Sequence, residues 1–96
     1  MNYSFHPHAE KELEEIEEYY DGQDEALGDR FRSDLEQALS RILRFPHGWH
    51  PLSRSIRRCT LDAFSYGVIY KVRKGEIRVL AVTHLHREPN YWGRRT

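Results

Sequence analysis

The hydrophobic pattern of this chain changes its period once, at the segment PHGWHPLSR (residues 46–54), and this change limits the possible folds more than any other feature. Before the segment, apolar residues recur every three or four positions, as in amphipathic helices; after it they alternate, as in half-buried strands. Helical segments followed by a run of strands predict an α+β architecture.

The first half predicts two helices. In the first, which follows Pro7 and ends at Asp21 and Gly22, one stripe carries Ala9, Leu13, Ile16 and Tyr20. Its glutamates, at positions 10, 12, 14, 15, 17 and 18, are expected to face solvent. The stripe of the second helix consists of Leu27, Phe31, Leu35, Leu39, Ile42 and Phe45, and Pro46 should end it. The two helices should form an antiparallel hairpin.

The second half predicts three strands, at residues 56–61, 64–72 and 76–83, and a short strand at residues 3–5 should precede the helices. Lys74 and Gly75 suit a tight turn, and Asp62 and Ala63 a second short connection, so consecutive strands should be antiparallel. The predicted fold is a single α+β domain over residues 1–96: a short N-terminal strand, an antiparallel two-helix hairpin, then a three-stranded antiparallel meander. Tyr70 belongs to the most apolar strand and should lie in the core.

Composition restricts the class of protein. The chain has 96 residues, 39% hydrophobic and 31% charged, which suits one small globular domain. Cys59 is the only cysteine, so no internal disulfide can form, and a reducing cytoplasm fits best. The longest aliphatic run, residues 79–82, is far shorter than the roughly 20 residues of a membrane span. We therefore expect a soluble cytoplasmic protein without membrane association.

The net charge of zero hides a division between the halves. Residues 1–40 carry twelve acidic and three basic side chains (3 − 12 = −9), and residues 41–96 carry twelve basic and three acidic ones (12 − 3 = +9). A surface of one sign steers association with a partner of the other sign. The basic half therefore indicates an anionic partner, unless it pairs with the acidic half of the same chain.

The closing stretch VTHLHREPNYW (residues 82–92) places His84, His86, Arg87, Tyr91 and Trp92 within nine positions. Imidazoles exchange protons near neutral pH, and aromatic residues with arginine are common at binding surfaces. A structural interpretation is also open, in which His84 caps the strand end and Trp92 packs the tail onto the domain. Nothing in the spacing supplies a full set of ligands, so we expect neither a metal site nor a cofactor.

Arg57 and Arg58 are neighbours on one predicted strand and must therefore point to opposite faces of the sheet. Only one of them can share a surface with Arg78, His84 or His86. The sequence does not fix the register, so the choice stays open.

Residues 56–95 resemble the RelE/ParE family of toxins from bacterial type II toxin-antitoxin systems, and the helical hairpin resembles them too. The motifs that carry the resemblance are Arg57-Arg58-Cys59, FSYGVIYKV, IRVLAVTH and the closing His84, Arg87, Pro89 and Trp92. The resemblance implies a small α+β toxin that acts in the bacterial cytoplasm and is neutralised by a cognate antitoxin. An antitoxin could dock on the edges of the meander or in a groove between the helices.

Two branches of this family differ in target: RelE-like members cleave messenger RNA in the ribosome, and ParE-like members inhibit DNA gyrase. The resemblance places Tyr91 at the tail tyrosine of the ribonucleases and Arg58 at a strand lysine. Gly67 and Leu85, however, stand where ribonucleases carry arginines, and Thr60 where they carry another lysine. RNA cleavage needs an acid, a base and cations for the phosphorane, so these departures favour the gyrase inhibitor.

Three functions therefore stay open, and whether the protein is an enzyme is one of the open points. The first is gyrase inhibition, with target-binding residues Arg57, Arg78, His86, Trp92, Arg94 and Arg95. The second is a ribosome-dependent nuclease, with catalytic residues Tyr91, Arg87, His84 and Arg58. The third is an inactive partner-binding module that serves plasmid maintenance. All three predict that the cations of the second half and Tyr91 converge on one exposed face.

Overall fold

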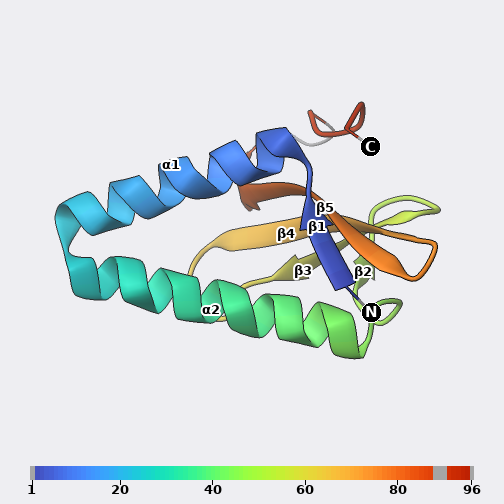
Figure 1. Ribbon diagram of the computed structural model, residues 1–96, viewed down its shortest axis with the longest axis horizontal. Helices are drawn as coiled ribbons and strands as arrows, with labels where there is room; N and C mark the ends of the chain where they lie inside the picture. The colour runs from blue at the N-terminus through green and yellow to red at the C-terminus, as the bar shows by residue number, and fades with distance from the viewer. Residues whose placement is uncertain (1, 88–90, 96) are drawn as a thin grey trace.

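The computed structural model describes residues 2–87 and 91–95, and in it two helices cover one face of a five-stranded sheet (Figure 1). The elements are β1 (Asn2–Phe5), α1 (Pro7–Gln23), α2 (Glu25–Arg44), β2 (His50–Pro51), β3 (Ile56–Thr60), β4 (Tyr66–Arg73) and β5 (Glu76–His84). Their order in the sheet is β1-β5-β4-β3-β2. Within the described residues, neither helix is long and apolar enough to cross a membrane.

The two predicted helices are confirmed, and Asp24 joins them. Its backbone N–H donates to the Tyr20 carbonyl at 3.0 Å and closes α1, and its carboxylate accepts from the Ala26 N–H at 2.9 Å and opens α2. The C-terminus of α2 carries Arg41 and Arg44, which complement the negative end of the helix dipole. One residue thus ends one helix and starts the next, so the hairpin reverses sharply (Figure 1).

The main core lies between the helices and the sheet, where the predicted stripes meet the strands. Its buried members are Ala9, Phe31, Leu35, Ala38, Leu39, Ile42, Cys59, Leu61, Val68, Tyr70, Ile77, Val79 and Val82. Tyr70 is fully buried, as predicted, and its hydroxyl donates to the Pro46 carbonyl at 2.6 Å. The expectation for Phe45 was wrong: this residue follows the last turn of α2, and its side chain is 58% exposed.

The predicted sheet was incomplete. The meander β3-β4-β5 is antiparallel, as expected, but the sheet has five strands and is mixed. β1 pairs with β5 in parallel, with Tyr3 opposite Ile77, and β2 pairs with β3. The chain from residue 61 to residue 65, between β3 and β4, is also longer than the two residues predicted. The sequence carries no periodic signal for either feature, because the partner of β1 lies more than 70 residues away and β2 has only two residues.

The register assigns each strand residue to a face. Arg57 lies opposite Tyr70 and therefore points toward the helices, whereas Arg58 lies opposite Ile69 on the other face, here called the back face. A β-bulge in the β4–β5 ladder places both Leu80 and Ala81 in the back-face cluster. The structure thus settles the question that the sequence left open: Arg58 belongs to the back face.

The C-terminal tail, of which the structure describes residues 85–87 and 91–95, lies over part of this second face. The Trp92 side chain is 5% exposed and packs against Ile69, Leu80 and Ala81. The second face of β4 and β5 is therefore partly covered, as the two-sided apolar strands indicate. Leu52, between β2 and β3, also packs against this cluster, so the cover comes from short segments rather than from α1 or α2.

Candidate functional site

The tail is fastened to the fold by three side chains, Glu12, Tyr91 and Arg95, here called the tail clamp. The Tyr91 hydroxyl donates to Glu12 Oε2 at 2.7 Å, and Arg95 Nη1 donates to Glu12 Oε1 at 2.8 Å. The same Arg95 nitrogen donates to the Leu80 carbonyl at 2.9 Å, and the Val82 N–H donates to Glu12 Oε1 at 3.3 Å. One carboxylate on α1 thus binds both the tail and the edge of β5.

The expectation that all six glutamates of α1 face solvent was wrong for Glu12. Its side chain is only 15% exposed, against 14% for its partner Arg95. A signal was present in the sequence, because position 12 is three residues after Ala9 and four before Ile16, both on the apolar stripe. A charged residue at such a position needs a buried partner, and only the fold could show that the partner is 83 residues away.

Two arginines lie close to the Tyr91 ring. The guanidinium carbon of Arg87 lies 4.0 Å from the centre of its ring, and that of Arg95 lies 5.0 Å from it. Burial raises the pKa of the Tyr91 phenol above its usual value, and the hydrogen bond to the Glu12 carboxylate adds to the rise. The phenol therefore keeps its proton at neutral pH and serves as a hydrogen-bond donor to Glu12.

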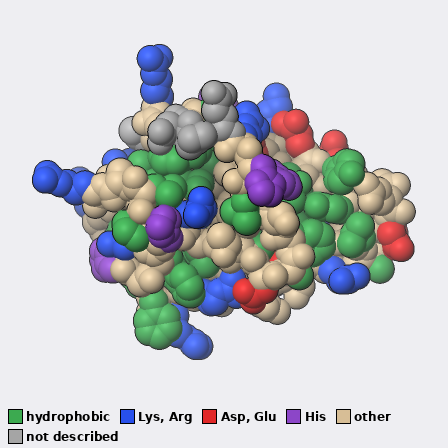
Figure 2. Space-filling model, turned by 180° about the vertical axis from the view of Figure 1, so that it is seen from behind, with side chains coloured by type: hydrophobic (Ala, Val, Ile, Leu, Met, Phe, Trp, Pro, Cys, Tyr) green, Lys and Arg blue, Asp and Glu red, His purple; other side chains and the backbone are tan. Residues whose placement is uncertain are grey.

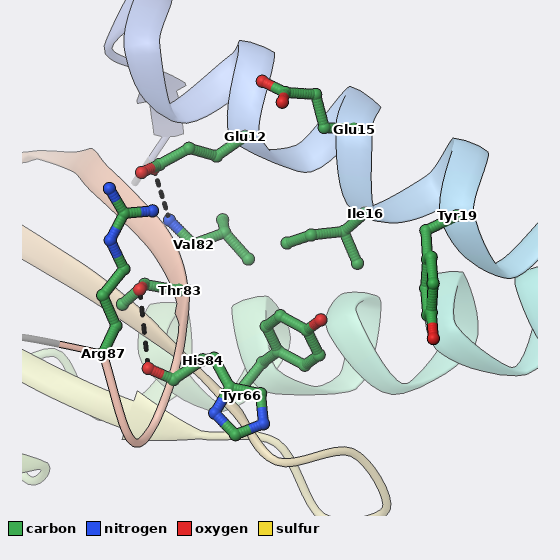
Figure 3. A pocket seen from close by; sticks show the side chains of 9 residues that line it. All are labelled: Glu12, Glu15, Ile16, Tyr19, Tyr66, Val82, Thr83, His84 and Arg87. Atoms are coloured by element: carbon green, nitrogen blue, oxygen red, sulfur yellow. Dashed lines mark hydrogen bonds between the residues drawn. The ribbon is translucent and has the colours of Figure 1, made fainter.

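A cleft of about 310 Å³ opens between α1 and the end of β5 (Figure 3). Its lining consists of Glu12, Glu15, Ile16, Tyr19, Tyr66, Val82, Thr83, His84 and Arg87. One wall is the side of α1 that carries Glu15, Ile16 and Tyr19, and the opposite wall carries His84 and Arg87. Burial, together with the neighbouring Tyr20 hydroxyl, raises the pKa of Tyr66 to about 12, so this phenol is also a neutral group.

His84 lies at the mouth of this cleft, exposed to solvent and on the helix-facing side of the sheet. Its ring contacts that of Tyr66, its register partner, with 5.3 Å between the centres. Its Nδ1 atom accepts from the His86 N–H at 3.2 Å, so the imidazole caps the chain beyond the strand end. This is the structural role that the sequence analysis left open for His84.

Arg58 occupies the back face, away from His84. A Cβ atom placed on Gly67 would lie 3.1 Å from the Arg58 side chain and 3.3 Å from Leu85, so these two residues fill the space beside the glycine. The Nε atom of Arg58 is buried and has no hydrogen-bond partner in the part of the chain that the structure describes. The positions where ribonucleases carry arginines, 67 and 85, are therefore packed together around the Arg58 stem.

The remaining candidate residues are spread over the sheet and tail. Arg57, on the helix side, donates to the Trp49 carbonyl at 2.9 Å, and Arg78 donates to Ser4 Oγ and to the Phe5 carbonyl, both at 3.2 Å. His86 and Arg94 are exposed. Seen from behind, Lys, Arg and His side chains surround an apolar area (Figure 2).

The predicted convergence on one face is therefore partial. The structure brings His84, Arg87 and Tyr91 together beside α1, and it places Arg58 on the opposite face of the sheet. Across residues 2–87 and 91–95, no three His, Cys, Asp or Glu side chains are grouped so that they could hold a metal ion.

A second carboxylate that sequence reasoning missed is Asp34, which is 6% exposed. It accepts from three backbone N–H groups, those of Asp62 at 3.2 Å, Ala63 at 2.8 Å and Phe64 at 3.1 Å. This residue shapes the loop between β3 and β4. Its position next to Leu35 on the apolar side of α2 was the available signal.

The arrangement of a helical hairpin on a mixed sheet recurs in a solved structure. A chain of the chromosomal ParDE TA system from P. aeruginosa superposes with a TM-score of 0.73 at 16% identity, covering 88% of this chain and 95% of that one. At this identity the likeness shows the fold alone.

The family follows from the sequence. The family model described as the ParE toxin of the type II toxin-antitoxin system parDE matches residues 3–89. The chain therefore belongs to the ParE toxin family, which confirms the resemblance found in its motifs. Curated protein sequences gave no match.

Proposed function

We propose that this ParE-family toxin arrests bacterial growth by inhibiting DNA gyrase in the cytoplasm, and that its cognate antitoxin neutralises it. The observation that carries the proposal is the separation of the four candidate catalytic residues. Arg58 and His84 lie on opposite faces of the sheet, and the Tyr91 hydroxyl is bound to Glu12. A toxin that binds its target needs no acid, base and cation at one point, whereas a nuclease does.

The packing around Gly67 also supports this proposal. An arginine at position 67 would need the space that the Arg58 stem and Leu85 now fill. Leu85 supplies an apolar side chain, 38% exposed, where the ribonucleases of the wider family carry a second cation. A phosphorane at this end of the sheet would therefore face fewer positive charges than in those enzymes.

The back face offers a surface for an anionic target. Its cations are Arg58, Lys71, Arg73 and Arg78, and the exposed Arg94 of the tail lies beside the buried Trp92. The acidic side chains of the chain are concentrated in the two helices, on the other layer. Charge complementarity of this kind directs one face of a protein to its partner and raises the rate of association.

The antitoxin is best accommodated by the cleft between α1 and β5, rather than by a groove between the helices. Apolar side chains there, Ile16, Tyr66 and the 60%-exposed Tyr19, adjoin Arg87 and His84. A peptide with apolar residues followed by a carboxylate would satisfy both parts of this cleft.

Expression in a bacterium, with and without the gene that adjoins this one, tests the proposal. We expect growth arrest, DNA breaks that depend on gyrase, inhibition of supercoiling by the purified toxin, and relief of all three by the antitoxin. Transcripts cut within ribosome-bound messenger RNA, and protected by Tyr91→Phe, would establish the nuclease instead. A chain that causes no arrest would be the inactive module.

A further inference from the structure

The edge of β5 is only half covered by a neighbouring strand. β1 pairs with Glu76–Val79, and the remaining part of β5, residues 80–84, extends beyond it (Figure 1). An uncovered strand edge presents backbone N–H and C=O groups that need partners. Here side chains supply two of them: Glu12 accepts from the Val82 N–H, and Arg95 donates to the Leu80 carbonyl.

Glu12 is the centre of this arrangement because both of its oxygens are used. Oε1 accepts from Val82 and Arg95, and Oε2 accepts from Tyr91, so one side chain joins α1, β5 and the tail. Charge-assisted bonds of this kind are stronger than neutral ones, and low exposure strengthens them further. Among the residues that the structure describes, no other ion pair joins the tail to α1.

The position of the tail cations follows from the same carboxylate. Glu12 fixes the Tyr91 hydroxyl and the Arg95 guanidinium, and the Tyr91 ring in turn supports the Arg87 guanidinium at 4.0 Å. The close-up of the cleft shows Glu12 directed across to β5, on the side where Arg87 lies (Figure 3). Releasing Glu12 would therefore free two arginines at once.

We propose that Glu12 is a positioning residue that, through Tyr91 and Arg95, holds the C-terminal tail on the uncovered edge of β5 and so keeps the exposed Arg94 at the back face for target binding. Its effect on the target rests on the proposed function, whereas its effect on the tail does not. Glu12 does not contact the target and acts on it only through the tail that it holds. Loss of the carboxylate should therefore loosen the tail and weaken inhibition while the helices and sheet stay folded.

The first test follows the tail itself by amide hydrogen exchange in the full chain. In Glu12→Ala, the Val82 amide should exchange about tenfold faster or more, because its acceptor is gone, while the amide of Val68 in β4 keeps its protection. Trypsin should also cut the tail faster. Glu14→Ala is the matched control: it removes one exposed glutamate from the same helix, and its exchange and cleavage should equal those of the wild type.

The second test is a double-mutant cycle on inhibition of gyrase supercoiling. Glu12→Ala and Arg95→Ala should each raise the toxin concentration for half inhibition by about tenfold, and the double variant should be no worse than either, because they remove one unit. Glu12→Gln, which keeps the shape and one oxygen, should lie between the wild type and Glu12→Ala. A purely structural role would change the unfolding midpoint without this coupling.

Two results would overturn the inference: a Val82 amide that exchanges in Glu12→Ala as in the wild type, or additive effects of Glu12→Ala and Arg95→Ala on inhibition. Failure of the wild type to inhibit gyrase is a separate outcome. It would overturn the proposed function, and the exchange experiment would still decide whether Glu12 holds the tail.

Discussion

The two faces of the sheet are built from the same strands but covered in different ways. The helix-facing side meets two helices of 17 and 20 residues, and Val68 and Tyr70 on it are fully buried. On the back face the described residues that pack on the strands come from the short tail and from Leu52, and the register partners Lys71 and Arg78 are only partly buried. The comparison shows how period-2 alternation lets one strand serve the core with one side and a partner with the other.

The charged groups on the two faces differ in the same way. Asp34, packed on the helix side, has its carboxylate satisfied by three backbone N–H groups. Arg58, on the back face, has a buried Nε without a partner among the described residues. The carboxylate of Asp34 thus holds the fold together, whereas the Nε atom of Arg58 makes no such contact. Substitutions on the helix side should therefore change stability, and those on the back face should change binding.

The largest effect is expected for Phe31→Ala. This fully buried ring contacts those of Tyr20, Phe64 and Tyr66, with centres 5.3 to 5.6 Å apart, so the substitution leaves a cavity in the main core. Urea denaturation should show a loss of about 3 to 5 kcal/mol in the free energy of unfolding.

The matched substitution on the other face is Trp92→Ala. Because the tail can relax into solvent, this change should cost less than Phe31→Ala in the same experiment. An equal or greater cost would mean that the back-face cluster is as much a core as the helix side, and the comparison would fail.

The next effect is expected for Asp34→Ala. The change removes the acceptor of three backbone N–H groups and should lower the free energy of unfolding by about 2 to 3 kcal/mol. Asp34→Asn retains one acceptor oxygen and should lose less. The exposed neighbour Glu36→Ala serves as the control and should stay within about 0.5 kcal/mol of the wild type.

Stability should depend on alkaline pH through Tyr70. Burial raises the pKa of this phenol to about 12, above the usual value of about 10 that it has in the unfolded chain. The folded state thus favours the protonated phenol, so its contribution is complete below pH 10 and is lost as pH rises to 12. The free energy of unfolding measured across this window should fall, by up to about 3 kcal/mol from this group, and should fall less in Tyr70→Phe.

The smallest effect on stability is expected for Arg58→Met on the back face. Methionine keeps the stem that packs beside Gly67 and removes the unpartnered Nε, so the free energy of unfolding should change by less than about 1 kcal/mol. If the back face binds the target, growth arrest should nevertheless weaken clearly, as a dose-response in cells would show. Full toxicity in this variant would separate Arg58 from target binding.

Much of the fold could be read from the sequence because it depends on neighbours in the chain. The stripes of α1 and α2 and the alternation of β3 to β5 are repeated local signals, and the turn at Lys74 and Gly75, with φ of 44° and 76°, has its own residue preference. Part of the candidate site could be predicted, because His84, Arg87 and Tyr91 are close in sequence. The face on which Arg58 lies depends on the strand register, which the sequence does not reveal.

The sequence by itself determined the helical hairpin, the antiparallel meander and the division of charge, because side-chain periodicity and composition act over short stretches of chain. The tertiary structure alone decided that β1 pairs with β5, that Arg58 faces away from His84, and that Glu12 among six glutamates binds the tail. Each of these depends on which distant groups meet, and the free energy of such a contact is defined only when the chain has folded.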